Sequence, residues 1–291
     1  MSKDQDPATD KVGEALKAQR FQMLEDIARE LEGNIVFPTS FDAALRLRKE
    51  LQNPNLPTAR IARIVGLEPL VASKLLHLAN SVLYSPDGTP ARDLSAAISR
   101  LGVELVRTTA LGIAMGQLMR SKEMVDFSDL TQALWQHSLK TAAAARVVAR
   151  TQTRIQPDEA MLAGLVHDLG AFYMLYRAAQ YPELRMRPDT VRYLIIEWHE
   201  SIGVTLLNAL GLPEEIVEAM IDHDQLRPGP IVVRTLADVI YVANVLGGAH
   251  FEWSRTPAGE HAEEMEALRL GFAGLQPEID ADAQTLNAVF A

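Results

Sequence analysis

Apolar residues recur three and four positions apart along most of the chain, which is the spacing of an amphipathic helix. We find no stretch of sustained two-residue alternation bounded by turn residues, as a half-buried strand would show. Glycine and proline separate the periodic segments and act as helix stop signals. The pattern predicts an all-α protein with helices over 10–32, 37–53, 58–66, 69–84, 94–102, 103–120, 128–151, 157–170, 190–211, 213–224 and 230–248, and shorter helical pieces around 262–270 and 281–290.

Local signals place some of the helix ends and loops. Thr39 or Ser40 can cap the second helix, and Ser128 can cap the helix that starts there. The stretch 85–93 is rich in proline and glycine and is therefore predicted to be a loop. We expect this loop and the stretch 121–128 to separate sub-bundles of helices.

Composition then narrows the classes of function. The 291 residues allow one large domain or two modest ones, and a formal net charge of −10 weighs against general affinity for the phosphate backbone of nucleic acids. There is no cysteine, so disulfides and thiolate chemistry are excluded and a metal would need His, Asp or Glu ligands. No apolar run approaches the length of a membrane span, and the polar N-terminus does not resemble a signal peptide. We therefore expect a cytoplasmic protein with no membrane partner.

The segment MLAGLVHDLG, residues 161–170, places His167 and Asp168 side by side in an apolar run. Buried charge is costly unless it is paired, hydrogen-bonded or bound to a metal. One face of this predicted helix carries Ala163, Gly164 and His167, so another element can approach closely there. The residues leave three interpretations open: a metal site, the remnant of one, or two core residues whose hydrogen bonds are satisfied.

Further His and Asp residues occur on the neighbouring predicted helices. His137, His199, His223 and Asp238 each lie among apolar positions, roughly one to a helix. A helical bundle builds a metal site from inward-facing side chains in this way, and imidazole and carboxylate ligands suit Fe, Mn, Zn or Ni. The alternatives are structural, because Asp238 could pair with Arg234 and His223 could interact with the end of its helix.

The order of these residues resembles a known pattern. His137, His167–Asp168 and Asp238 resemble the H…HD…D ligand set of the HD superfamily of metal-dependent phosphohydrolases. WHESIG around His199 and DHD around His223 resemble the extra histidine positions of the HD-GYP subgroup, which hydrolyses cyclic di-GMP. The resemblance implies metal ligation by His137, His167, Asp168 and Asp238, with Asp168 able to bridge to a second metal held by His199 and His223.

The N-terminal half resembles the start of an HDOD domain, and the resemblance covers residues 35–245 in collinear order. It implies an HD-type helical bundle with an N-terminal helical sub-bundle. The expected organisation is an N-terminal extension over 1–34, an HDOD domain over 35–245 divided into a sub-bundle (35–120) and an HD-like core (121–245), and a C-terminal helical tail over 246–291. The motifs that carry the resemblance are Glu68-Pro69-Leu70, Leu75-Leu76, Ala79-Asn80-Ser81, AAISRLG and LWQHS.

The family resemblance implies a bacterial signalling or regulatory module that is non-catalytic or weakly active and works with a signalling protein or a small nucleotide. Catalysis is disfavoured because no GYP segment follows His223, and Ala171 stands where active HD proteins often carry a lysine. The alternative is a metal-dependent phosphohydrolase, acting on a phosphodiester such as a cyclic dinucleotide. Asp168 and Lys140, one turn after His137, would then be the catalytic candidates.

A third interpretation concerns nucleic acid. Residues 58–80 resemble a helix-turn-helix, with a turn at Gly66 and locally basic surroundings. Ser73, Lys74 and His77, together with Asn80, would be available for groove contacts. The acidic net charge makes nucleic-acid binding the weakest of the three interpretations.

Overall fold

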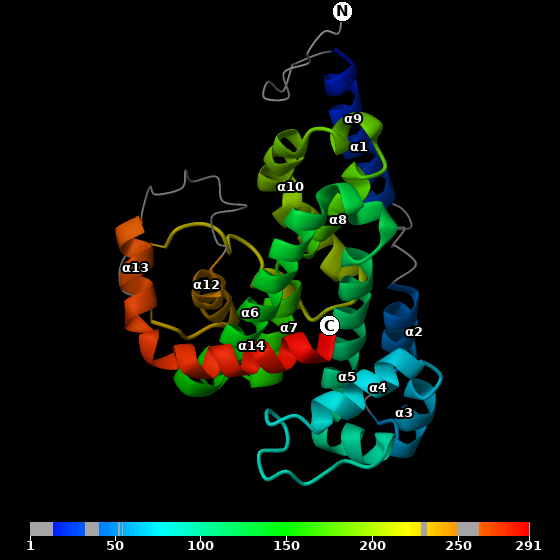
Figure 1. The fold of residues 1–291 in the computed structure, drawn as a ribbon, viewed down its shortest axis with the longest axis vertical. Coiled ribbons are helices and arrows are strands. Elements are labelled where there is room, and N and C mark those ends of the chain that lie inside the picture. The colour runs from blue at the N-terminus through cyan, green and yellow to red at the C-terminus, as the bar shows by residue number, and fades with distance from the viewer. Residues whose placement is uncertain are drawn as a thin grey trace, which may run out of the picture.

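A computed structural model describes residues 14–32, 41–51, 53, 55–227, 232–248 and 262–290 (Figure 1). Every regular element in these ranges is a helix, which confirms the all-α fold. No helix among the described residues has the length and apolar character needed to cross a membrane. The elements in chain order are α1 (Glu14–Glu32), α2 (Asp42–Glu50), α3 (Thr58–Val65), α4 (Pro69–Ala79), α5 (Leu94–Met119), η2 (Lys122–Phe127), α6 (Ser128–Gln152), α7 (Pro157–Val166), α8 (Leu169–Ala178), α9 (Pro182–Arg185), α10 (Pro188–Ala209), α11 (Glu214–Glu218), α12 (Leu236–Gly247), α13 (Ala262–Gly271), η3 (Ala273–Leu275) and α14 (Gln276–Phe290).

Two groups of helices share the long helix α5. Its first part packs against α2, α3 and α4, and its later part contacts α6, α7 and α8 (Figure 1). Gly102 has a φ of 80° and interrupts α5, which confirms the predicted helix end at this residue. This left-handed conformation costs glycine little because it has no Cβ. The break lets one continuous segment serve both groups.

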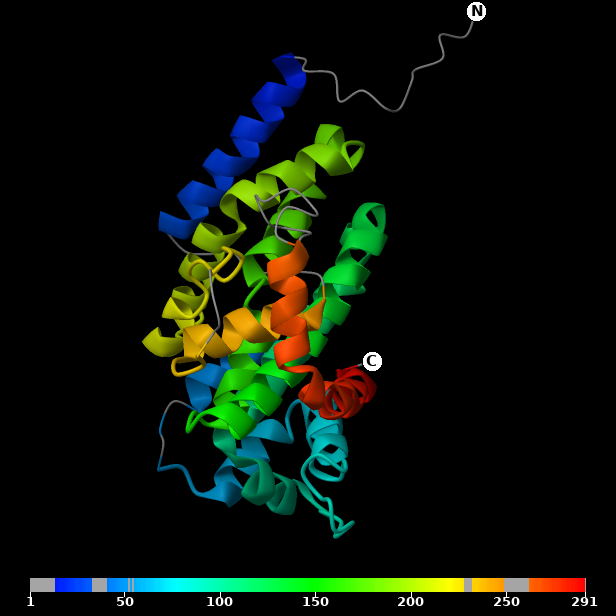
Figure 2. The same cartoon turned by 90° about the vertical axis from the view of Figure 1, so that its left-hand side faces the viewer.

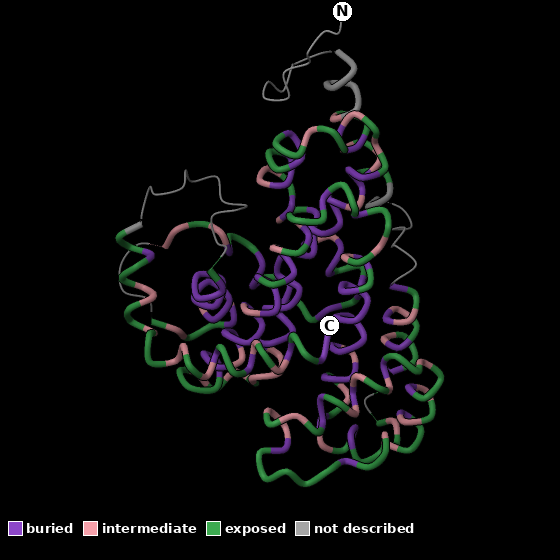
Figure 3. The backbone as a smooth tube through the Cα atoms, viewed as in Figure 1, coloured by how far each residue is buried: buried purple, intermediate pink, exposed green. Residues whose placement is uncertain are grey.

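The core is centred on α6, α7 and α12. Figure 3 shows these helices as mostly buried backbone, whereas the outer faces of α13, α14 and the α3–α4 region are exposed. Every residue of α7 from Ala160 to Val166 is buried, as expected for a helix that is apolar on all sides. Gly164 allows the backbones of α7 and α6 to pack in direct contact, since a Cβ there would lie 2.8 Å from the Thr141 carbonyl oxygen.

Several predicted boundaries differ from the structure, among them the end of 69–84, which is a helix only over Pro69–Ala79. The predicted helix 157–170 is two helices, with His167 and Asp168 at their junction, and 213–224 forms a helix only over Glu214–Glu218. Ser128 is the first residue of α6 rather than its cap, because η2 runs directly into that helix. The predicted helix 230–248 begins only at Leu236, where Thr235 provides the cap. Thr39 and Ser40 lie outside the described residues.

The C-terminal helix α14 packs against the body of the protein. Figures 1 and 2 show it packed on the outside of the bundle, and it runs alongside α6 from Arg146, which binds Asp282 at 2.9 Å, to Gln136, which binds Asn287 at 3.2 Å. The Phe290 ring lies against Gly112 on α5, where a Cβ would come within 2.6 Å of the ring, and it meets the Trp135 ring edge to face. The last turn of α14 is thus anchored by a buried aromatic side chain.

We expect Phe290→Ala to destabilise the protein by about 3–5 kcal/mol, because it leaves a cavity between α5 and α6. Urea unfolding and calorimetry would measure the loss. Gln284→Ala, on the exposed side of the same helix, is the control and should change stability by less than about 0.5 kcal/mol. Equal effects of the two substitutions would contradict the packing of α14 described above.

Candidate metal centre

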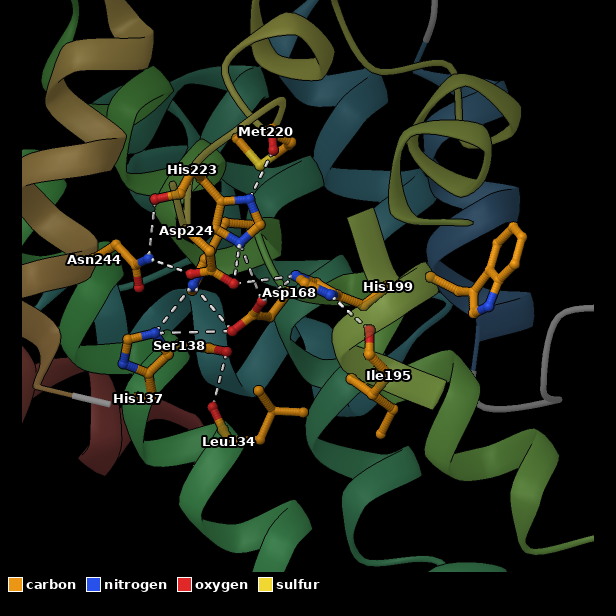
Figure 4. Close-up of polar contacts among 12 residues, drawn as sticks. Leu134, His137, Ser138, Asp168, Ile195, His199, Met220, His223, Asp224 and Asn244 are labelled. Atoms are coloured by element: carbon orange, nitrogen blue, oxygen red, sulfur yellow. Dashed lines mark hydrogen bonds and ion pairs between the residues drawn. The ribbon is translucent and has the colours of Figure 1, made fainter. Parts of the chain in front are cut away.

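Six titratable side chains converge in the interior of the bundle, and Figure 4 labels all of them except His167. They come from four separate parts of the chain, and their side chains are between 0% and 12% exposed. The six are His137 on α6, His167 and Asp168 at the junction of α7 and α8, His199 on α10, and His223 and Asp224 in the turn after α11. We call this set the His/Asp cluster.

One half of the cluster is formed by His137, His167 and Asp168. The Nε2 atoms of the two histidines are 3.1 Å apart. Oδ2 of Asp168 lies 3.1 Å from Nε2 of His167 and 3.8 Å from Nε2 of His137. One ligand atom from each residue lies within 4.8 Å of the others, which is close enough for all three to bind one ion.

The other half is formed by Asp168 with His199, His223 and Asp224. Oδ1 of Asp168 lies 3.4 Å from Nε2 of His223, and Oδ2 of Asp224 lies 3.3 Å from Nε2 of His199. These four residues also offer ligand atoms within 4.8 Å of one another. Asp168 therefore belongs to both halves, and presents one carboxylate oxygen to each.

The backbone fixes the tautomer of three of the histidines. Nδ1 of His167 lies 2.9 Å from the Gly164 carbonyl, Nδ1 of His199 lies 2.8 Å from that of Ile195, and Nδ1 of His223 lies 2.7 Å from that of Met220. A carbonyl oxygen can only accept a hydrogen bond, so each Nδ1 donates. In the neutral ring the lone pair is then on Nε2, which faces the cluster, as metal-binding histidines require.

Glycine permits the close helix contacts that bring the cluster together. A Cβ on Gly170 would lie 1.9 Å from the His199 carbonyl oxygen, so α8 approaches α10 with no room for a side chain. A Cβ on Gly247 would lie 3.1 Å from the His137 ring. The HDLG segment thus supplies two of the six groups and also the contact that sets the position of a third.

Charge within the cluster is balanced among its own members. Burial opposes protonation of His223, but the Asp224 charge and a hydrogen bond with Asp168 outweigh it and raise the pKa of His223 to about 10. Burial and the nearby His167 lower the pKa of His137 to about 4. Burial alone would raise the pKa of Asp168, but His167 and His223 hold it well below its ordinary value. Burial likewise opposes ionisation of Asp224, but His223 and His199 lower its pKa, so both aspartates stay ionised beside protonated His223.

Asp238 lies outside the cluster. Its carboxylate accepts hydrogen bonds from the backbone of Arg234 at 3.0 Å and Thr235 at 2.9 Å, and Thr235 Oγ1 accepts one from the Asp238 backbone in return. This capping box holds Asp238 at the first turn of α12, where Arg227 also pairs with it at 2.9 Å. The expected pairing partner Arg234 contacts it through the backbone only.

Asp224 stands in the cluster where the sequence suggested Asp238. Asn244 of α12 donates to Oδ1 of Asp224 at 2.8 Å and to the His223 carbonyl at 3.3 Å. One sequence signal could have pointed to Asp224: the His-Asp dipeptide occurs twice in the chain, and the structure brings both copies together. The turn that aims the second copy inward includes Asp222 with a φ of 58°.

The remaining candidates lie at the edge of the cluster or away from it. Lys140 lines a cavity of about 520 Å³ between α6, the end of α12 and α14, and His137 is the one cluster residue in its lining. In the helix pair α3–α4, the Asn80 side chain binds both the backbone N–H and the carbonyl of Ala91. Asn80 is thus committed to the adjacent loop, and the other groove candidates stay predictions.

Comparison with known proteins identifies the family. The HDOD domain pattern matches residues 37–226, about two thirds of the chain. The chain belongs to the HDOD family. A search of curated proteins finds no match to this HDOD protein. The family assignment agrees with the all-helical bundle, and it confirms the resemblance seen in the sequence.

Solved structures share the fold. A proposed metal-dependent phosphohydrolase from Shewanella amazonensis SB2B superposes with a TM-score of 0.69 at 24% identity, covering 94% of this chain and all of that one. An HDOD domain protein of unknown function from Geobacter sulfurreducens gives 0.59 at 20% identity, with 94% and 99% covered. A proposed signal transduction protein from Marinobacter aquaeolei VT8 gives 0.53 at 20%, with 97% and 69% covered. At these identities the likeness extends to the fold.

We expect Gly170→Ala to destabilise the protein and to displace His199, because the new Cβ would overlap the His199 carbonyl. Overpacking of this kind costs about 1–3 kcal/mol. Differential scanning calorimetry gives the loss, and the His199 imidazole resonances should shift in NMR spectra. Gly274→Ala, where a Cβ meets nothing within 4 Å, is the control; a Gly170→Ala protein as stable as this control would contradict the close contact of α8 and α10.

Proposed function

We propose that this HDOD protein is a signal-transduction module whose His/Asp cluster holds a divalent transition metal in the core. The observation that carries the proposal is the orientation of the buried imidazoles. Three of them donate Nδ1–H to backbone carbonyls, so Nε2 faces the aspartates. This orientation directs the Nε2 atoms of three separate parts of the chain toward one point, as ligation of a common ion requires.

Charge supports the same assignment. Asp168 and Asp224 bring two negative charges into an interior that excludes water, and isolated buried charges are strongly unfavourable. One divalent cation would balance both carboxylates in place of protonated His223 and would leave the histidines neutral. The donors are nitrogen and carboxylate oxygen, which suit Mn, Fe, Zn or Ni.

A bound ion would supply Lewis acidity at this point or would serve as a structural link between helices. The ion would be held by His137 and His167 on one side, by His199, His223 and Asp224 on the other, and by Asp168 between them. Because these residues come from α6, the α7–α8 junction, α10 and the turn after α11, the link would tie four parts of the bundle together.

Burial favours a regulatory role over turnover. Asp168, His167 and His223 have almost no exposed surface, so a phosphodiester could not reach them in this conformation. Ala171 is also fully buried and supplies no cation. We propose that the module passes its signal to a protein partner or responds to a small nucleotide.

We expect purified native protein to contain a stoichiometric transition metal, measured by inductively coupled plasma mass spectrometry. Asp168→Asn should lose most of it, since the substitution removes the carboxylate shared by both halves of the cluster. Asp238→Asn is the matched control and should retain the metal, because Asp238 caps α12. Chelation of the wild-type protein should lower its melting temperature, since a metal that binds only the folded state stabilises it.

Two results would contradict this proposal. One is native protein that carries no metal and takes up none when dialysed against Mn²⁺, Fe²⁺, Zn²⁺ or Ni²⁺. The other is equal loss of metal from Asp168→Asn and Asp238→Asn, which would return Asp238 to the ligand set and place the ion elsewhere.

A metal-dependent phosphohydrolase is the second candidate function. It is favoured by the two adjoining groups of ligand atoms that share Asp168, since paired metal sites serve many phosphodiesterases. Lys140 would then hold a phosphate in the cavity beside His137.

We expect wild-type protein loaded with Mn²⁺ to hydrolyse bis(p-nitrophenyl) phosphate no faster than Asp168→Asn, because the cluster is closed to substrate. Release of p-nitrophenolate is measured by absorbance, and cyclic dinucleotides are tested by chromatography. Metal-dependent hydrolysis that disappears in Asp168→Asn and weakens in Lys140→Met would establish the second candidate and overturn the non-catalytic assignment.

A further inference from the structure

A second cavity, of about 620 Å³, lies apart from the His/Asp cluster. Figures 1 and 2 show α13 standing on the outer side of α12, and the cavity lies between these helices, near the end of α6. Its volume is in the range of small-molecule sites, which are mostly apolar with a few polar groups that orient the ligand. Leu226, Leu268, Phe272 and Leu275 give it apolar walls, and its polar lining includes Arg227, Gln152 and Glu264.

Arg227 is the cation of this cavity. Its guanidinium lies over the Tyr241 ring, 4.9 Å from the centroid, and its backbone N–H donates to the Tyr241 hydroxyl at 3.1 Å. One guanidinium nitrogen, Nη1, pairs with Asp238. Stacking and pairing hold the planar group in one orientation, which lowers the entropy cost of binding a ligand anion.

The charge of Arg227 is only partly used by Asp238. The Asp238 carboxylate also accepts the backbone N–H groups of Arg234 and Thr235 at the positive end of the α12 dipole. These donors lower the pKa of Asp238 and already stabilise its negative charge, although burial opposes them. Arg227 can therefore attract a further anion at the cavity wall.

We propose that this cavity binds a small organic anion with an aromatic body, about the size of a nucleoside monophosphate. Arg227 pairs with the anionic group, and Phe272 and Leu268 pack against the aromatic body. Gln152 and Glu264 are further polar side chains of the lining that can lie beside the ligand.

The cavity is linked to the His/Asp cluster through neighbouring residues, although no cluster residue is in its described lining. Arg227 follows Asp224 by three residues, and Tyr241 precedes Asn244 by one helical turn on α12. Asn244 in turn holds Asp224 at 2.8 Å. Ligand binding that restrains Arg227 and Tyr241 would therefore restrain Asp224. This coupling rests on the proposed metal site, whereas ligand binding in the cavity does not.

The fluorescent aromatic sulfonate 8-anilinonaphthalene-1-sulfonate matches this chemistry and serves as the probe. We expect saturable binding to the folded, metal-free protein, and an increase in Kd of about tenfold or more in Arg227→Met, from loss of a charge-assisted hydrogen bond. Ala267→Phe, which fills the cavity from α13, should abolish binding. Adenosine monophosphate should displace the probe from the wild-type protein.

Matched controls lie close to the cavity, on α13 and η3. Arg269→Met removes an arginine from α13, and Ala273→Phe adds a ring at an exposed position of η3; neither residue lines the cavity. Both should bind the probe within twofold of wild type, and circular dichroism should show all four variants folded. Absence of saturable binding, or equal effects of Arg227→Met and Arg269→Met, would overturn the proposal.

The coupling is tested by repeating the titration with Mn²⁺ bound. We expect the probe to bind metal-loaded protein at least threefold more tightly, and Mn²⁺ to bind more tightly in the presence of the probe by the same factor. Unchanged affinity in protein that does hold Mn²⁺ would overturn the coupling alone. Protein that takes up no metal would contradict the proposed function, while the metal-free titration still decides whether the cavity binds a ligand.

Discussion

The carboxylate of Asp168 is the group on which the arrangement of the bundle depends. It is almost fully buried and ionised, and its two oxygens face two different sets of imidazoles. A buried carboxylate must be compensated by positive charge or hydrogen-bond donors on every side. The helices that supply these groups must therefore meet at Asp168, whatever their order in the chain.

The junction of α7 and α8 makes this meeting possible. The helical conformation is interrupted at His167 and Asp168, so both side chains reach the cluster. In a continuous helix, successive side chains point about 100° apart, and two neighbouring residues would face one point less easily. Gly170 then allows the α10 backbone to approach closely, with Gly203 facing it across the contact. The backbone carbonyls of Gly164, Ile195 and Met220 orient the rings, so main-chain geometry, rather than side-chain pairs alone, sets the direction of the donor atoms.

Much of this could be predicted from the sequence, and the failures have physical causes. Helical spacing predicts the all-α fold, and the rule of one polar residue per apolar helix selects His137, His167, Asp168, His199 and His223, which the structure brings together. Their role as ligands stays a prediction. Asp238 also fits that rule, because an aspartate at the third position of a helix and one in its middle look alike when the helix start is misplaced. Thr235, three residues earlier, carries the capping signal that distinguishes them.

The rule of one polar residue per apolar helix did not select Asp224. It lies in a turn and not on a helix, so no periodicity marks it as inward-facing. Its position depends on the left-handed residue Asp222 and on Asn244, which lies 20 residues further along the chain. Such a contact is set by tertiary structure, and it adds α12 to the elements that hold the cluster in place. At the start of α12, Asp238 pairs with Arg227. Further along the helix, Asn244 binds Asp224, and the last residue, Gly247, lies against the His137 ring. A displacement of this one helix would therefore be felt by both halves of the cluster, which is the physical property that a regulatory module requires.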